Sequence, residues 1–247
     1  MRQRRGAGRR RARAALARGL WAAAEVTVTL GVVVLLLVVH QLWWTNRQAQ
    51  ERAERTVQRL ERDWGSRAGG PEPAPDPATA PAPAPAPTRR EPRDPPRWDQ
   101  AYAVLRIPRL GVVAPVAQGV GRRGVLDQGY IGHYPGTAQP GRAGNFAVAG
   151  HRNTHGEPFR YINRLRSGDM VRIETREGIF DYAVDRRLAQ TTPRDTGVIE
   201  PVPRSLVRPS AGYGEPGYYL TMTTCTPEFS SRYRLVVWAK LTSMRPR

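Results

Sequence analysis

Residues 20–44 read LWAAAEVTVTLGVVVLLLVVHQLWW and are apolar except for Glu25, two threonines, His40 and Gln41. About 20 apolar residues, each rising about 1.5 Å in a helix, cross a bilayer core of about 30 Å. Aromatic side chains favour the membrane–water interface, and this stretch has tryptophans near both ends, at Trp21, Trp43 and Trp44. The sequence therefore predicts a transmembrane helix over residues 20–44.

A strongly basic tail, residues 1–19, precedes this stretch and contains no acidic residue. The chain has a net charge of +18, and much of the excess lies in this tail, which argues against a nucleic-acid-binding role for the rest of the chain. Cytoplasmic flanks of membrane helices are enriched in Lys and Arg, so we expect a cytoplasmic N-terminus and an extracellular C-terminal part. A secretory signal peptide is the alternative, but bulky and charged residues follow Trp44 where a cleavage site needs small ones. We favour an uncleaved single-pass anchor in the cell membrane.

Residues 45–97 have the composition of a stalk and a linker. The segment 45–65 is rich in charged residues and good helix formers and ends at Gly65, which predicts a solvated helix or stalk. In residues 71–97 proline recurs at every second position in places. Such a segment adopts extended polyproline II and forms no packed core. We interpret it as a spacer rather than as a ligand for a proline-recognition domain.

Residues 98–247 are long enough to form one hydrophobic core. Their apolar runs are short, rich in β-branched and aromatic residues and bounded by turn residues, which is typical of strands: AYAVLRIPRLGVVAPV, GNFAVAGH, DMVRIET, IFDYAVDRRLA, GYYLTMTTC and YRLVVWAKL. The turn REGIF predicts a hairpin between residues 170–175 and 179–184. Residues 156–169 alone favour a short helix, with Phe159, Ile162 and Leu165 at helical spacing. The pattern predicts an all-β domain, either a small barrel or a sandwich.

Cys225 is the only cysteine of the chain. An unpaired cysteine in an exported protein forms an intermolecular disulfide, is buried and inert, or acts as a nucleophile. Alternation in LTMTTC places Thr221, Thr223 and Cys225 on one face of a strand that Pro227 ends. The thiol therefore lies at the rim of the domain, where a nearby base or positive charge can lower its pKa from about 8.5.

His151 is the predicted base, because it follows the apolar strand GNFAVAG just as Cys225 ends its own strand. His155 remains an alternative base. We expect His133, in the turn-rich segment GHYPG, to be a surface or hydrogen-bonded residue. A zinc site formed by His151, His155 and Cys225 is weakly supported, because zinc sites use closely spaced pairs of ligands.

Arg232 and Arg234 share one face of the last strand, SRYRLVVWAKL. Arginine stays charged and donates hydrogen bonds in a fixed fork, which suits an oxyanion or a substrate carbonyl. Two solvated strand arginines are the alternative interpretation. The opposite face is predicted to be core and consists of Tyr233, Leu235, Val237, Ala239 and Leu241.

Three motifs in this order resemble those of the sortases, membrane-anchored cysteine transpeptidases of Gram-positive bacteria: NFAVAGHR at 145–152, TMTTC at 221–225 and RLVV at 234–237. With GHYPGTAQPGRAGN at 132–145, they are most similar to the class E sortases of actinobacteria. The resemblance covers about residues 98–241. It implies a closed eight-stranded β-barrel, with Cys225 as nucleophile, His151 as general acid and base, and Arg234 holding substrate and oxyanion; Arg232 is the alternative to Arg234.

The implied reaction begins when Cys225 attacks the Thr–Gly bond of a sorting signal of LPXTG or LAXTG type. An amine of a peptidoglycan precursor, similar to lipid II, then resolves the acyl-enzyme. Asn145, Thr223 and Thr224 are the candidate substrate-binding residues. No cofactor and no metal is implied. The segment 190–216 would be the loop between the sixth and seventh strands, which forms one wall of the substrate groove in the family.

Two other classes of protein remain open. One is a non-catalytic, membrane-tethered module that binds peptide or wall polymer. The other is a different cysteine enzyme of the cell wall. An L,D-transpeptidase has its cysteine in a Ser-His-Gly-Cys context, and papain-like hydrolases place cysteine before histidine. Here His151 precedes Cys225 and the context is Thr-Thr-Cys, which weakens both of these enzyme hypotheses.

Overall fold

The computed structural model of the protein describes residues 4–68 and 96–247. The proline-rich segment predicted to be a spacer lies almost entirely outside these residues. The chain divides into two compact units, Met1–Thr45 and Asn46–Arg247, and each is described by itself.

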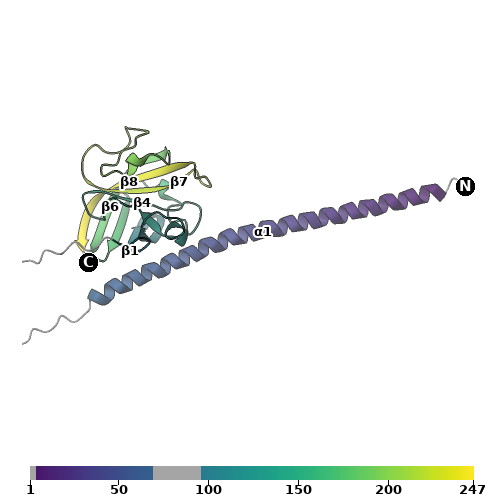
Figure 1. Cartoon of the computed structure of the whole chain (residues 1–247), viewed down its shortest axis with the longest axis horizontal. Coiled ribbons are helices and arrows are strands. Elements are labelled where there is room, and N and C mark those ends of the chain that lie inside the picture. The colour runs from purple at the N-terminus through teal and green to yellow at the C-terminus, as the bar shows by residue number, and fades with distance from the viewer. Residues whose placement is uncertain (1–3, 69–95) are drawn as a thin grey trace, which may run out of the picture. The chain divides into compact units, whose positions relative to one another are not determined.

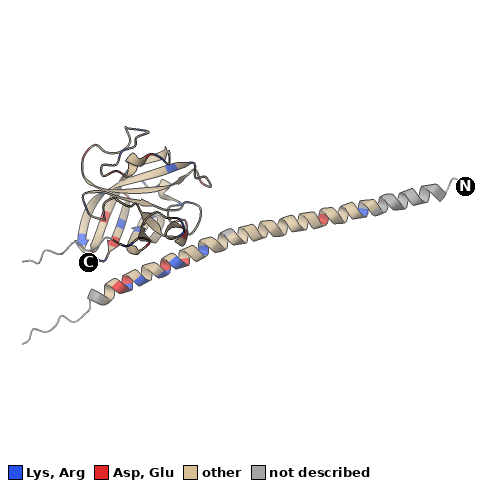
Figure 2. Ribbon diagram, in the orientation of Figure 1, with Lys and Arg blue, Asp and Glu red and all other residues tan. Residues whose placement is uncertain are grey.

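The N-terminal unit consists of the first part of helix α1, Arg4–Ala68. Figure 2 shows a long segment of this helix with little charge, followed by a segment in which acidic and basic residues alternate. By length and composition, α1 is the one helix of the described residues that could cross a membrane. Within the apolar stretch, the hydroxyls of Thr27 and Thr29 donate to the carbonyl oxygens of Ala23 and Glu25, at 2.8 Å each. These polar side chains are therefore satisfied inside the helix, as an apolar environment requires.

The second unit contains a closed barrel with the strand order β1-β2-β3-β4-β7-β8-β6-β5 (Figure 1). This confirms the predicted eight-stranded barrel. Its strands are β1 Ala101–Ile107, β2 Val112–Gln118, β3 Ile131–His133, β4 Gly144–Ala149, β5 Met170–Thr175, β6 Gly178–Thr191, β7 Tyr218–Thr226 and β8 Tyr233–Pro246. Most neighbours are antiparallel, but β2 pairs with β3 and β4 pairs with β7 in parallel. The β5–β6 hairpin is present as predicted, with Glu174 opposite Ile179.

The barrel interior is filled by alternate residues of its strands. On β8 the predicted core face is confirmed for four of its five residues, because Leu235, Val237 and Ala239 belong to the main buried cluster and Leu241 packs against it. The fifth, Tyr233, is half-buried and lies outside that cluster. The other face of β8 is also buried, since Val236 and Trp238 form a second cluster with Val198 of the 192–217 connection. This long connection therefore packs on the outside of the barrel next to β7 and β8.

Two local expectations differ from the structure. Residues 156–169 form no α-helix but only the 3-10 turn η3, Ile162–Arg164. The apolar spacing still identified buried side chains, since Phe159, Ile162 and Leu165 all belong to the core. A segment this short does not offset the cost of helix nucleation. The strand β3 was not predicted, because its three residues are too few to show alternation.

Residues 46–68 of α1 form the predicted helix, but it is not solvated all round. One face is buried in the barrel unit, and its members recur every three or four residues, as on one side of a helix: Ala49, Ala53, Val57, Leu60 and Trp64. Val57, Leu60 and Trp64 cluster with Val104 of β1. The charged residues that suggested a stalk occupy the remaining faces.

Candidate active site

Two parallel strands, β4 and β7, bring His151 and Cys225 to the same rim of the barrel. Ala149 is paired with Thr223 at the end of this ladder, and the amide of Gly150 donates to the Thr223 carbonyl at 3.1 Å. His151 and Cys225 each lie two residues beyond that pair, so the parallel register carries both residues to the rim side by side. The predicted convergence of two strand ends is therefore present.

Cys225 is a half-buried free thiol near the end of β7. Arg152, which follows the histidine, donates from Nη1 to the Cys225 carbonyl at 3.2 Å and to the Thr226 hydroxyl at 2.8 Å. The Arg152 side chain is buried. It ties the loop after β4 to the end of β7, and sequence reasoning missed it because nothing in the motif separates it from the many surface arginines.

Arg234 lies directly opposite Cys225 in the antiparallel β7–β8 ladder. Directly opposed residues project to the same side of a sheet. The Arg234 side chain is half-buried, and its Nη1 donates to the carbonyls of Ser231 and Tyr233 at 2.9 and 3.0 Å. Arg232 precedes β8, is exposed, and stacks over the Tyr233 ring at 5.2 Å. Of the two arginines, only Arg234 is in register with the thiol.

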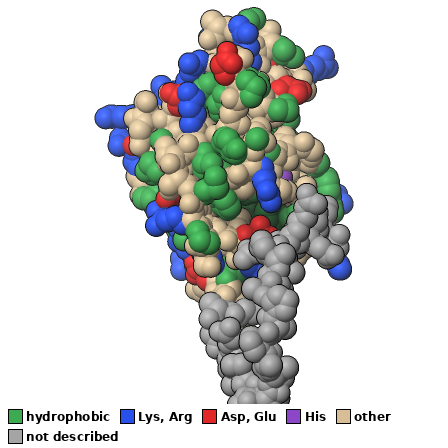
Figure 3. Space-filling view, turned by 90° about the vertical axis from the view of Figure 1, so that its left-hand side faces the viewer, with side chains coloured by type: hydrophobic (Ala, Val, Ile, Leu, Met, Phe, Trp, Pro, Cys, Tyr) green, Lys and Arg blue, Asp and Glu red, His purple; other side chains and the backbone are tan. Residues whose placement is uncertain are grey.

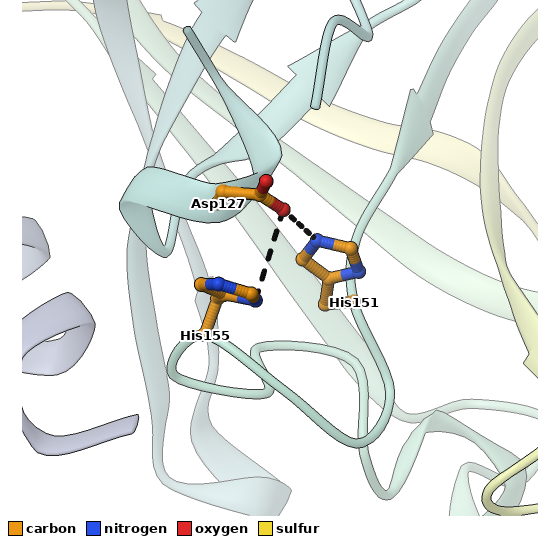
Figure 4. A group of neighbouring side chains, drawn as sticks. All are labelled: Asp127, His151 and His155. Atoms are coloured by element: carbon orange, nitrogen blue, oxygen red, sulfur yellow. Dashed lines mark hydrogen bonds and ion pairs between the residues drawn. The ribbon is translucent and has the colours of Figure 1, made fainter. Parts of the chain in front are cut away.

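Asp127 makes a direct contact with His151 that the sequence did not predict (Figure 4). Its Oδ1 lies 2.8 Å from His151 Nε2 and 3.7 Å from His155 Nδ1. Asp127 sits in the 3-10 turn η2, Leu126–Gln128, far from both histidines in the sequence. No sequence motif relates Asp127 to the two histidines, so the contact can be seen only in the folded barrel. Hydrogen bonding at Nε2 leaves Nδ1 of His151 as the nitrogen for proton exchange with a thiol.

The environment of His151 lowers the pKa of its imidazole. Burial is the largest cause, while the hydrogen bond and the charge of Asp127 oppose the shift. The neighbouring His155 and Arg122 lower the pKa further. His151 is therefore neutral near pH 7 and can accept a proton.

Asp127, His151 and His155 have donor atoms that all lie within 4.8 Å of one another, a spacing that could suit a metal ion. The set differs from the weak zinc set considered from the sequence, since Asp127 takes the place of Cys225. The 2.8 Å contact between Asp127 and His151 already accounts for this geometry.

The three residues considered for substrate binding are buried and hydrogen-bonded inside the barrel unit. Asn145 Nδ2 donates to the Glu200 carbonyl at 3.0 Å, and Thr224 donates to the Gly150 carbonyl at 2.8 Å. Thr223 donates to the Val148 carbonyl at 3.3 Å. Through these bonds all three residues stabilise β4, β7 and the segments next to them. Their direct contact with substrate stays a prediction.

His133 is fully buried rather than at the surface. Its Nδ1 lies 2.9 Å from both the Tyr102 hydroxyl and Gln118 Oε1, which confirms a hydrogen-bonded role. Burial lowers the pKa of His133 to about 4. His133 is a neutral core histidine. It lies on β3, which is separated by β4 from the strand β7 that carries Cys225.

The connection between β6 and β7 lies where the predicted loop was expected, and it is held by a buried carboxylate. Asp195 accepts hydrogen bonds from the hydroxyls of Thr191 and Ser205 and, at 2.7 Å, from the amide of Leu206. A short bridge, Arg204 with Gly212, closes the outer part of the connection. The loop is thus a fixed structure beside β7.

The face of the barrel unit drawn in Figure 3 carries hydrophobic side chains between separate basic and acidic ones. On this face Lys and Arg do not merge into one basic surface of the kind that binds nucleic acid. Residues 1–19 carry +8 of the net charge of +18, so the tail accounts for a large part of the excess but not for all of it.

The family described as the sortase domain matches residues 105–242. Among curated proteins, the chain is 42% identical over 231 residues to sortase SrtE1 of Streptomyces coelicolor, covering 90% of this chain and 57% of that protein. It is 28% identical over 244 residues to SrtE2 of the same organism, covering 96% and 87%. The chain thus spans little more than half the length of the first of these relatives.

Solved structures give the same result. The crystal structure of sortase E1 from Streptomyces coelicolor with a tripeptide in the active site is 49% identical, with a TM-score of 0.57, over 60% of this chain and 92% of that one. Sortase E from Streptomyces avermitilis is 43% identical, with a TM-score of 0.54, over 61% and 93%.

Proposed function

Since this chain belongs to the sortase family of cysteine transpeptidases, we propose that it cleaves the Thr–Gly bond of an LPXTG- or LAXTG-type sorting signal and transfers the protein to an amine of a cell-wall precursor. The observation that carries this proposal is the strand register, which brings three residues to one rim of the barrel. Cys225 lies near the end of β7, His151 lies two residues beyond the end of the parallel strand β4, and Arg234 lies opposite Cys225. The tripeptide in the active site of the related sortase E1 supports a peptide substrate.

In the first half-reaction His151 Nδ1 takes the proton of the Cys225 thiol, and the sulfur attacks the threonine carbonyl carbon. The tetrahedral intermediate carries negative charge on the former carbonyl oxygen. In this proposal the guanidinium of Arg234 stabilises this charge, because an oxyanion needs a fixed donor. The carbon–nitrogen bond to glycine then breaks, His151 returns its proton to the departing amine, and a thioester on Cys225 remains.

In the second half-reaction an acceptor amine attacks the thioester and gives a proton to His151. The new amide forms and the Cys225 sulfur leaves and regains the proton. Asp127, bonded to Nε2 of His151 at 2.8 Å, fixes the ring so that the same nitrogen serves in both halves. No cofactor is required by this sequence of steps.

We further propose that the apolar part of α1 anchors the enzyme in the cell membrane as a single pass, with the N-terminus in the cytoplasm and residues 98–247 outside. Sorting-signal proteins and a lipid-linked precursor both reach the enzyme at that surface. The basic tail before the apolar segment supports this orientation.

The test uses the full chain in detergent micelles with quenched LAXTG and LPXTG peptides and a small amine acceptor. We expect cleavage and an amine-linked product with wild type, and loss of both with Cys225→Ala. The proposal fails if wild type cleaves neither peptide or if Cys225→Ala cleaves equally well. Peptide binding that is equal in both proteins, without cleavage, would instead identify a binding module.

A further inference from the structure

Residues 46–68 are the docked part of α1, the part with one face buried in the barrel unit. Its first turns contact the loop that carries Asp127. A Cβ at Gly129 would lie 2.7 Å from the Ala49 carbonyl oxygen, so only glycine allows this close approach of helix and loop. The hydroxyls of Thr56 and Tyr130 are 2.8 Å apart. The helix therefore rests directly on the turn that holds Asp127 against His151.

The same turns of α1 also hold the loop that carries His155. Three successive residues of this loop have positive φ angles, His155 at 52°, Gly156 at 84° and Glu157 at 52°. Residues other than glycine rarely adopt a positive φ unless neighbouring groups hold them in place. Asn46 supplies that support, because its Nδ2 donates to Glu157 Oε1 at 2.7 Å and its Oδ1 accepts from the Gly156 amide at 3.4 Å.

The two loops meet under the helix. A Cβ at Gly156 would lie 3.5 Å from the Gln50 backbone nitrogen and 3.6 Å from the Gly129 Cα. Further along the helix, Glu61 forms an ion pair with Arg106 of β1. The guanidinium of Arg247 stacks over the Trp64 ring at 4.4 Å. The helix is thus fixed at both ends of its docked length.

We propose that residues 46–68 of α1 are a positioning element of the active site, in which Asn46 and the buried helix face hold the loops of Asp127 and His155 in place around His151. This inference rests on the proposed role of His151 as general acid and base. Release of the helix would free both loops together and weaken the contact between Asp127 and His151. Burial is the largest cause of the lowered pKa of His151, and the charged or titratable groups that act on it are Asp127, His155 and Arg122.

The experiment compares full-length variants in detergent micelles. Asn46→Ala removes both side-chain bonds to the 156–157 loop, and Gln58→Ala is its matched control, an amide lost from an exposed position of the same helix. Ala53→Glu places a charge in the buried helix face, and Gln58→Glu adds the same charge on the exposed face. The readouts are kcat/KM across pH and the titration of labelled His151 followed by NMR.

For Asn46→Ala and Ala53→Glu we expect kcat/KM to fall by about 5- to 10-fold with a smaller change in KM. The acid limb of the pH profile and the titration of His151 should both move to lower pH, because the stabilising contact with Asp127 weakens. Both Gln58 variants should match wild type. Unchanged rates and an unchanged His151 titration in Asn46→Ala and Ala53→Glu would overturn the proposal. A lower rate with an unmoved titration would also overturn it, by showing a general loss of folded enzyme.

The two proposals fail in different ways. An inactive wild-type enzyme would refute the transpeptidase activity, while the NMR titration would still test the positioning role of the helix.

Discussion

Replacing Asp195 with alanine should destabilise the connection between β6 and β7. The carboxylate is only 4% exposed and accepts three hydrogen bonds, from Thr191, Ser205 and the Leu206 amide. Alanine leaves all three donors without their acceptor. Asparagine keeps a side-chain oxygen that can accept from the Leu206 amide. Its NH₂ group faces the hydroxyls of Thr191 and Ser205, and these hydroxyls can rotate to accept from it.

The size of the effect follows from these contacts. A hydrogen bond to a charged group contributes about 1.5–3 kcal/mol, and the three losses are partly offset because hydroxyls can turn to water or to carbonyls. We therefore expect Asp195→Ala to lower the free energy of unfolding by about 3 kcal/mol, and Asp195→Asn by about 1–2 kcal/mol. For a unit of this size, about 3 kcal/mol corresponds to a fall in Tm of roughly 6–12 °C.

Thermal unfolding of the full chain, followed by tryptophan fluorescence, measures this change. Trp238 is a suitable reporter, because its Nε1 donates to the Val198 carbonyl of the same connection at 3.2 Å. Glu215→Ala is the matched control, since it removes an exposed acid from the same connection and should shift stability by less than about 0.5 kcal/mol. Because each kcal/mol moves Tm by about 2–4 °C, a Tm for Asp195→Ala within about 2 °C of the control would refute the reasoning.

Three further predictions concern histidines and arginines. Burial keeps the pKa of His133 at about 4, against 6.5 for the free side chain, so the unfolded chain takes up a proton in that range and the folded chain does not. The neutral His133 contributes fully to stability above about pH 6.5, and this contribution, about 3 kcal/mol in all, is lost as the pH falls toward 4. In urea unfolding, the loss of stability between pH 7 and pH 4.5 should be smaller for His133→Gln than for wild type. An equal loss in the two proteins would contradict the assignment. Asp127→Asn removes the interactions that raise the pKa of His151 against burial, so the acid limb of kcat/KM should move to lower pH, and a shift to higher pH would be inconsistent with this geometry. Arg234→Ala should lose far more activity than Arg232→Ala in the peptide assay, and equal losses would leave the choice between them unsupported.

Hydrophobic alternation predicted an all-β domain, because strands that bury one face leave a two-residue pattern in the sequence. The closed eight-stranded barrel was implied by the resemblance to the sortases. Most of the core face of β8 was found from the alternation, and the β5–β6 hairpin followed from the turn residues between its strands. The placement of His151 and Cys225 at strand ends also followed from local signals, namely an apolar run that stops at a glycine or a proline.

Contacts between distant loops could not be predicted in the same way. Asp127 reaches His151 only because barrel closure brings the η2 turn beside the end of β4. The docked face of α1 was hidden because two of its members, Ala49 and Ala53, are small and lie among charged residues. A composition of that kind is typical of a solvated helix, and only the barrel surface opposite it shows which face is buried.

The proposed mechanism requires a covalent acyl-enzyme on Cys225, and intact-protein mass spectrometry tests this requirement most directly. The full chain is incubated with an LAXTG peptide without an amine acceptor and quenched in acid. We predict a mass increase equal to the peptide fragment that ends at threonine, less one water, located on Cys225 and removed by hydroxylamine. Cys225→Ala should show no such adduct. A wild-type protein that cleaves the peptide without an adduct on Cys225, or a Cys225→Ala protein that still acquires one, would contradict the mechanism.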